Sequence, residues 1–195
     1  MSLTNRMGDL VVTDPQAMRA LAHPVRLAAL SYLQRHGPAT ATQLSEHVGA
    51  SPSVTSWHLR HLASFGLVTD ADASEVGGDR RQRWWKAKAR GFSLQMGDDR
   101  ESQAAGRMLV NELFSTAQEQ TRQWLAETEP DLEPVWRRLA GPSNTRIVLA
   151  HAELDELEER IDDLLAEYVH REPAAAPDGA RLVRVLRYFL PPGPT

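Results

Sequence analysis

The sequence predicts a mostly helical α+β protein, and three observations support this prediction. Apolar residues recur at helical spacing through residues 1–91, where prolines and glycines divide them into short segments. The same spacing continues over 98–129 without a proline, which indicates one long helix. Residues 145–190 change from a strand-like pattern to a helical one and back. We therefore expect an N-terminal domain over 1–91, followed within 92–195 by a long helix and a small strand-helix-strand unit.

Two helices open the N-terminal domain. The first is expected to begin at Pro15 and to end before His23, because a residue that precedes a proline resists the helical conformation. The second begins at Pro24 and ends at Gly37, and its leucines at helical spacing supply a core face. Residues 1–12 carry no comparable pattern, and we expect them to form a frayed tail.

Two further helices are joined by a turn of a few residues. Thr40 can cap the first of them, and Gln43 follows three residues later, which is the spacing of a capping box. Ser51 can cap the second helix, Pro52 suits its first turn, and Gly66 can close it in a left-handed conformation. A helix, a short turn and a second helix with a polar outer face form the helix-turn-helix pattern.

The second helix of this pattern has two faces. One is an apolar stripe that includes Thr55 and is bordered by His58, and it predicts packing against a core. The other combines small hydroxyls, an indole and a guanidinium, with no acidic residue on the helix. Such a helix can lie in a DNA major groove, where arginine can bind guanine bidentately; a solvated amphipathic helix is the alternative for this segment alone. The residues of this helix that we expect at the DNA are Ser53, Thr55, Ser56, Trp57, His58 and Arg60.

A basic wing is expected directly after this helix. Residues 67–69 and 82–89 have the composition of short strands, and a turn-rich stretch joins them. Two strands joined by such a loop would form a wing, whose basic residues suit contact with phosphates. The wing residues that we expect at the DNA are Arg80, Arg81 and Arg83.

Three stretches together resemble ArsR-type winged helix-turn-helix transcriptional regulators. They are LAHPVRLAALSYL at 21–33, QLSEHVGASPSVTSWHLRHLASFGLV at 43–68, and the basic wing. The resemblance covers roughly residues 14–91 and implies a homodimeric, usually repressing protein that binds double-stranded operator DNA. By similarity to that pattern, Ser53, Ser56, Trp57 and Arg60 fall where family members touch the groove, and the three wing arginines fall on the wing.

The long helix over 98–129 has an apolar stripe that needs a partner surface. In the family that our sequence resembles, a helix in this position forms the dimer interface. The residues that we expect at this interface are Leu109, Leu113, Phe114, Ala117 and Trp124. Burial against the C-terminal part of the same chain is the alternative, and both arrangements can hold together.

The C-terminal residues predict a short helix and then a small α+β unit. The helix is expected over 131–140, a strand over 145–151, a second helix over 152–171, and a second strand over 180–190. Two strands alone are marginally stable. We therefore expect them to pair with another strand or with the second subunit of a dimer.

Metal sensing by cysteine is excluded because the chain has no cysteine. Related regulators also bind metals through histidines and carboxylates on the dimer helix, but residues 98–129 contain no histidine. His151 with Asp155, and Glu167 with His170, are the remaining candidates, and such pairs on an acidic helix are more often solvated than ligating. We therefore predict no metal and no cofactor, and the effector is left open between a small molecule, temperature and none.

The charge distribution fits a DNA-binding front and a non-binding rear. Residues 1–91 hold 11 Lys and Arg against 7 Asp and Glu, whereas residues 92–195 hold 11 against 19. No phosphate loop, zinc-protease motif or nucleophile elbow is present, so we do not predict an enzyme. No apolar stretch has the length of a signal peptide core or of a membrane span, and we expect a soluble cytoplasmic protein.

These observations predict a dimeric, sequence-specific transcriptional regulator, with repression as the expected mode. The alternative is a winged-helix module that binds other proteins through its acidic C-terminal half. The arginines of the recognition helix and the wing favour the first reading, because a protein-binding winged helix has no need of them.

Overall fold

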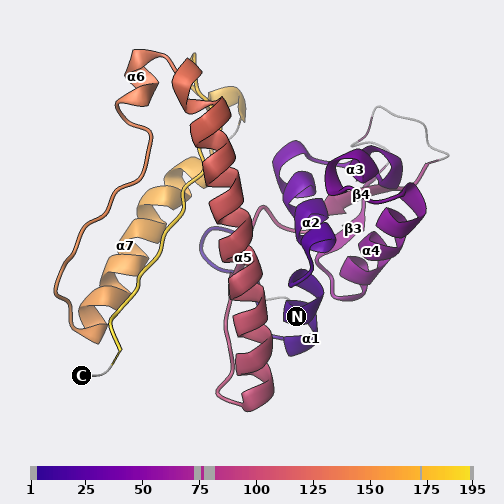
Figure 1. Cartoon of the computed structure of the whole chain (residues 1–195), viewed down its shortest axis with the longest axis horizontal. Helices are drawn as coiled ribbons and strands as arrows, with labels where there is room; N and C mark the ends of the chain where they lie inside the picture. The colour runs from indigo at the N-terminus through magenta and orange to yellow at the C-terminus, as the bar shows by residue number, and fades with distance from the viewer. Residues whose placement is uncertain (1–3, 73–75, 77–81, 172, 194–195) are drawn as a thin grey trace.

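The computed structural model of the chain describes residues 4–72, 76, 82–171 and 173–193 (Figure 1). Short helices and strands alternate up to residue 94: β1 (Leu10–Val12), α1 (Pro15–Leu21), α2 (Pro24–His36), β2 (Ala39–Thr40), α3 (Ala41–Val48), α4 (Pro52–Ser64), β3 (Val68–Asp70), β4 (Trp84–Ala87) and β5 (Phe92–Leu94). Helices alone follow: α5 (Arg100–Glu127), η1 (Glu129–Asp131), α6 (Pro134–Arg137), α7 (His151–Val169) and η2 (Pro173–Ala175). None of the helices in this described part combines the length and the apolar character that a membrane crossing needs.

The predicted wing is a β-hairpin in a three-stranded antiparallel sheet. The strand order is β2-β4-β3, and Val68 of β3 lies opposite Ala87 of β4. The strand that we predicted over 82–89 is shorter than expected, since β4 covers only Trp84–Ala87. The predicted contacts Arg80 and Arg81 belong to the connection between β3 and β4 and lie outside the described residues.

A second sheet joins the N-terminal segment to the segment before α5. β1 pairs with β5 in parallel, with Leu10 opposite Phe92. Leu10 and Val12 are buried. The prediction of a frayed tail over 1–12 is therefore wrong for this strand. Three apolar residues are too few to show a period, and their partner strand lies about eighty residues further along the chain.

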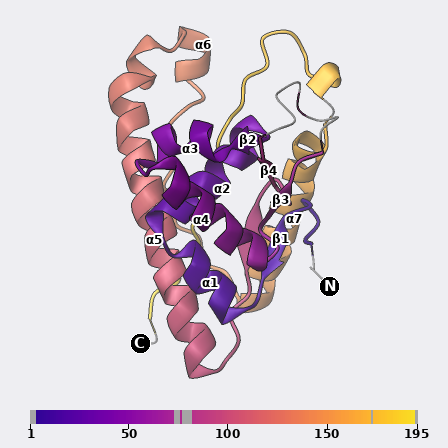
Figure 2. The same ribbon diagram turned by 90° about the vertical axis from the view of Figure 1, so that its right-hand side faces the viewer.

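The hydrophobic core of the N-terminal domain extends across residue 91 into α5. Met18, Leu59 and Trp85 are among its fully buried members, and Ala105 and Leu109 of α5 belong to the same cluster. α1 packs along the N-terminal turns of α5 (Figure 2). Small residues on this face of α5 let the two helices approach closely, so the beginning of the long helix is part of the N-terminal core.

The five residues predicted at a dimer interface divide into two groups. Leu109 is fully buried in the core of its own chain, Leu113 packs against that core, and Ala117 is 4% exposed. Phe114 remains 52% exposed, and Trp124 is half-buried. An interface contact from Leu109 does not fit this structure, because its side chain is occupied within the subunit. The alternative of intramolecular burial applies to it, although the surface that covers it is α1 and the core, not the C-terminal part.

The two predicted C-terminal strands are not formed. Residues 145–149 and 180–190 run as extended chain on either side of α7 and belong to no sheet (Figure 1). The helix predicted over 152–171 is present as α7, while the helix predicted over 131–140 is reduced to the single turn of α6. A strand needs a neighbouring strand to pair its backbone groups, and among the described residues neither segment has one.

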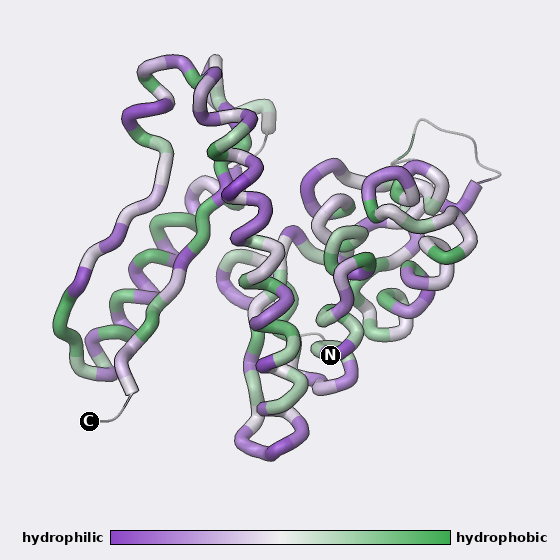
Figure 3. The backbone as a smooth tube through the Cα atoms, viewed as in Figure 1, coloured by the Kyte–Doolittle hydropathy of each residue, from purple (hydrophilic) through white to green (hydrophobic). Residues whose placement is uncertain are grey.

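Apolar side chains in the C-terminal part remain largely uncovered. Among the described residues, none after Ala117 is buried. Figure 3 shows hydrophobic residues along both extended segments, and Val148 is 100% exposed. The N-terminal domain thus has a closed core, whereas the described residues after 117 have exposed apolar side chains and no buried ones.

Leu109→Ala tests whether α5 is an integral part of the N-terminal core. We expect it to lower the free energy of unfolding by about 2–5 kcal/mol, because a buried leucine leaves a cavity. Urea denaturation at several protein concentrations measures this, and the loss should not depend on concentration. Leu125→Ala, at a position that is 47% exposed on the same helix, is the control and should cost far less. A loss that disappears at high protein concentration would instead place Leu109 in an interface between subunits.

Candidate DNA-binding surface

The helix-turn-helix is fixed locally by its caps. Thr40 and Gln43 form a reciprocal capping box at the start of α3, as the sequence predicts. Gly49 closes α3 in a left-handed conformation with φ of 65°, a geometry that glycine adopts without strain. Ser51 then caps α4 by accepting a hydrogen bond from the backbone N–H of Val54 at 3.4 Å. These caps set the angle at which α4 leaves α3.

The outer face of α4 presents an indole and a guanidinium to solvent. Trp57 is 53% exposed, and its ring stacks on that of His61 with centroids 5.5 Å apart. Arg60 is exposed and donates a hydrogen bond to the hydroxyl of Ser56 at 2.8 Å. Ser53 is also exposed, near the N-terminus of the helix. Four of the six residues predicted on this helix therefore share one accessible face.

The other two predicted contacts of α4 point into the protein. Thr55 is fully buried, and His58 is 6% exposed. Both lie on or beside the apolar stripe of the helix, which faces α2 and the core. A direct contact from Thr55 or His58 with a duplex does not fit this arrangement, because core side chains cover them. Both residues hold the helix in place from beneath.

The half-buried His23, which precedes α2, contacts the buried His58 of α4. Their ring centroids lie 4.7 Å apart, and Trp57 meets the His58 ring edge-on at 4.9 Å. The Nδ1 atoms of both histidines are buried and have no hydrogen-bond partner among the described residues. Burial lowers the pKa of both rings. The positive charge of Arg26 lowers the pKa of His23 further, and His23 and then Arg26 lower the pKa of His58. Glu112 of α5 acts in the opposite direction on His23.

Arg26 is buried and joins α1 to α2. Its guanidinium donates hydrogen bonds to the backbone carbonyls of Ala20 and Arg19, and the second of these measures 3.3 Å. Carbonyls in the last turn of a helix lack partners within the helix. Arg26 is 8% exposed, so it satisfies these carbonyls and does not face a phosphate.

On the wing, Arg83 is bound by Asp70, the last residue of β3. Its guanidinium donates to both carboxylate oxygens of Asp70, at 2.6 and 3.1 Å, and lies 4.1 Å from the centroid of the Trp85 ring. The hydrogen bond from Arg83 lowers the pKa of Asp70. The sequence motif did not reveal this pair, because the two residues are separated by the whole connection between β3 and β4. Arg83 therefore offers less net charge to a phosphate than a free arginine would.

The folded-state pKa values of His23 and His58 predict a loss of stability in acid. Both lie below 6.5, so the fold favours the neutral rings. Their contribution should be complete above pH 6.5 and should decrease as the pH falls from there through the folded-state pKa values. Urea denaturation at about pH 7.5 and about pH 5.5 measures the difference.

His58→Gln should reduce this pH dependence, because the amide does not titrate in this range. His36→Gln, at an exposed position of α2, is the matched control and should leave it unchanged. An equal pH dependence in the wild-type protein and in His58→Gln would show that His58 does not carry the effect.

The comparisons with known proteins address the same part of the chain. Residues 23–70 match the model of the bacterial regulatory protein, arsR family. The match begins at the residue that precedes α2 and ends with β3, and it covers about a quarter of the chain. A comparison with curated proteins finds no match to the chain. Residues 23–70 thus form a helix-turn-helix domain of the kind found in bacterial regulatory proteins of the arsR family.

Proposed function

We propose that this protein is a transcriptional regulator that inserts α4 into the major groove of operator DNA. The observation that carries the proposal is the accessible face of α4, where Trp57 and Arg60 stand beside small hydroxyls within an arsR-type domain. α4 contains no acidic residue, so nothing on the helix repels a phosphate backbone. Arginine is the side chain that most often reads guanine in this groove.

The wing is proposed to lie over the neighbouring backbone or minor groove. Lys88 and Arg90 follow β4 and are exposed, and they add positive charge beside the hairpin. Two subunits would place two α4 helices on half-sites about one helical turn apart, as dimer geometry requires. A repressor is the expected mode, on the basis of the resemblance to the family. A cytoplasmic location follows from this proposal, because the DNA of a bacterium lies there.

A protein-interaction module remains the second candidate, and one observation favours it. The described residues after 117 expose many apolar side chains, among them Leu139, Val148 and Leu182, and the helix α7 in this part is acidic. Such a surface fits a protein partner better than DNA, since its acids would repel phosphates. The two candidates differ in whether the N-terminal domain binds DNA tightly at physiological salt.

Arg60→Ala tests the proposed base contact. We expect it to weaken binding to the DNA upstream of the protein's own gene by roughly 1–3 kcal/mol, with a smaller effect on a scrambled duplex. Fluorescence anisotropy with both duplexes across a salt series measures the two affinities. Arg160→Ala is the control, because Arg160 is an exposed arginine of α7 far along the chain from α4. Equal losses on the two duplexes would assign Arg60 to the phosphates, and no loss on either would argue against the proposal.

Asp70→Asn tests whether the ion pair between Asp70 and Arg83 prevents Arg83 from contacting DNA. Releasing Arg83 from its carboxylate partner should strengthen binding to any duplex. The slope of log affinity against log salt should steepen by about 0.9, the amount for one further phosphate contact. The measurement is the same salt series, with Asp155→Asn on α7 as the control for a simple change of net charge. An unchanged slope would mean that Arg83 stays on the wing and does not reach a phosphate.

A further inference from the structure

The outermost side chains of α4 lie on a line opposite its buried stripe. The buried residues of the helix are Thr55, His58, Leu59 and Leu62. Because a helix turns by about 100° per residue, the line opposite them runs through Ser53, Trp57, Arg60 and Ser64, which are all exposed. Trp57 and Arg60 are thus the two large side chains that stand farthest from the core. When a helix lies in a major groove, side chains on such a line face the base edges.

The indole of Trp57 is supported by two neighbouring rings. His61, one turn further along α4, stacks on it with ring planes 2° apart and centroids 5.5 Å apart. The buried His58 meets it edge-on at 4.9 Å. An exposed side chain that is already held in place loses less conformational entropy when a ligand binds it. The two rings therefore prepare Trp57 for contact with a partner.

His61 is connected in turn to the core. Phe65 meets its ring edge-on at 5.3 Å and packs against the hydrophobic core. Burial lowers the pKa of His61, and the positive charge of Arg26 lowers it further, so this ring is mostly uncharged at neutral pH. The row from Trp57 to Phe65 is therefore an apolar support that extends from the core to the outer face of α4.

The part of Trp57 that these rings leave open is apolar, and the side chain is 53% exposed. Base edges in the major groove carry hydrogen-bond donors and acceptors, and their characteristic apolar group is the C5-methyl group of thymine. Arg60, the other large side chain on the outer line, suits the two acceptors of guanine. A phosphate would suit a cation and would leave the apolar surface of the indole in water. The thymine methyl group is thus the partner that matches Trp57.

We propose that Trp57 contacts the C5-methyl group of a thymine in the bound DNA and thereby determines part of the sequence specificity. Residues of an α-helix rise by about 1.5 Å each, so Trp57 and Arg60 stand about 4.5 Å apart along the axis. Base pairs are stacked about 3.4 Å apart. The thymine therefore lies one or two base pairs from the base that Arg60 contacts.

This inference rests on the proposed function, because it requires α4 to lie in the major groove. It adds the identity of a second base and the side chain that recognises it. DNA binding as such and the dependence on a methyl group are measured separately below, so the failure of one can be distinguished from the failure of the other.

Replacement of thymine by uracil tests the contact, because uracil pairs in the same way and lacks only the C5-methyl group. The purified full chain first enriches a duplex from a pool of random sequence. Fluorescence anisotropy then gives its affinity for that duplex and for the same duplex with uracil at every thymine position. We expect binding to weaken by about fourfold for each contacted methyl group, the loss that corresponds to one buried methyl or methylene group.

Trp57→Ala isolates the part of this effect that the indole carries. The ratio of the two affinities should fall by the same factor of about fourfold per half-site. Each variant is compared with itself on two duplexes, so a loss of folded protein or of general DNA affinity cancels in the ratio. Arg60→Ala should bind both duplexes more weakly and keep the wild-type ratio. Uracil at single positions locates the contacted thymine, which should lie within two base pairs of the base whose recognition Arg60→Ala loses.

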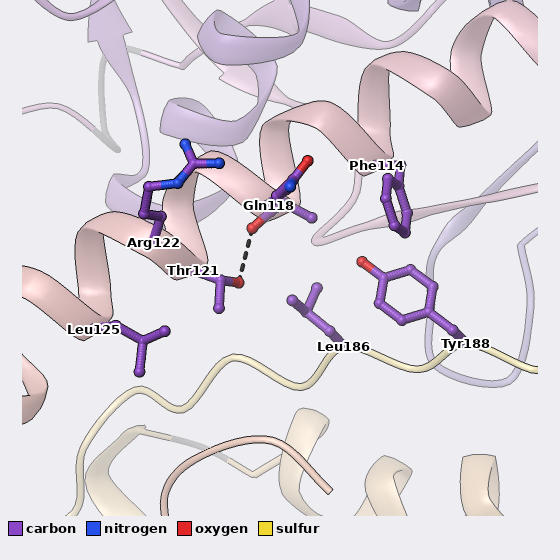
Figure 4. Close-up of a pocket in the computed structure, with 8 residues that line it drawn as sticks. Phe114, Gln118, Thr121, Arg122, Leu125, Leu186 and Tyr188 are labelled. Carbon is purple, nitrogen blue, oxygen red and sulfur yellow. Dashed lines mark hydrogen bonds between the residues drawn. The ribbon is translucent and has the colours of Figure 1, made fainter. Parts of the chain in front are cut away.

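Two further variants serve as matched controls. Val54 is an apolar residue of α4 that is 46% exposed and lies at the flank of the outer line. Tyr188 is an aromatic residue that is 51% exposed, and it meets Phe114 in the hollow that α5 forms with Leu186 and Tyr188, remote from α4 in sequence (Figure 4). Val54→Ala and Tyr188→Ala should both keep the wild-type ratio.

Three results would overturn the proposal. An equal ratio in the wild-type protein and in Trp57→Ala would mean that the indole contacts no thymine methyl group. A ratio that falls in Val54→Ala and not in Trp57→Ala would assign the methyl contact to the flank of the helix. In both cases the enriched duplex would still support DNA binding by the protein. A pool from which no sequence is enriched would instead argue against the proposed function, and the thymine contact would fail with it.

Discussion

The packing of α1 on the first turns of α5 is the constraint on which the rest of the structure depends. Ser102, Ala105 and Gly106 form a face of small side chains, and Leu109 extends it into the core. The side chain of Met96 lies where a Cβ atom on Gly106 would be, so this glycine also leaves room for the segment that leads into α5. The long helix is thereby fixed to the N-terminal domain. α7 is joined to that domain as well, through ion pairs of Arg6 with Glu159 and Asp163.

The orientation of α4 depends on polar groups that lie between this helix and the helices α1 and α2 beneath it. His23 and His58 contact each other between α2 and α4, Arg26 binds the last carbonyls of α1, and Glu112 brings the charge of α5 close to His23. These groups connect the surface that is proposed to meet DNA with the helix that carries the C-terminal part. A change of charge at Glu112 can therefore act electrostatically on the contact between His23 and His58 beneath α4.

Local signals were sufficient to predict the N-terminal helices. The caps at Thr40 and Ser51 and the break at His23 mark helix ends whose physical causes lie within a few residues. Features that depend on distant partners were missed: the pairing of β1 with β5, the ion pair between Asp70 and Arg83, and the core position of Leu109. At the site, periodicity placed Thr55 on the apolar stripe, where the structure buries it, although we had also expected it among the DNA contacts. The C-terminal alternation predicted two strands that the structure does not form, because alternation specifies side-chain faces and not the strand that pairs.

The contact between α1 and α5 also determines when the N-terminal domain can fold during synthesis. Arg19 and Glu101 form an ion pair across a separation of 82 residues. Synthesis proceeds at about 5–20 residues per second, so α1 leaves the ribosome seconds before the helix that covers it. The apolar residues Met18 and Leu21 stay uncovered during this interval, and the N-terminal domain cannot close its core until translation has passed Leu109. For nascent chains, the folding unit is thus longer than the DNA-binding domain that the family pattern delimits.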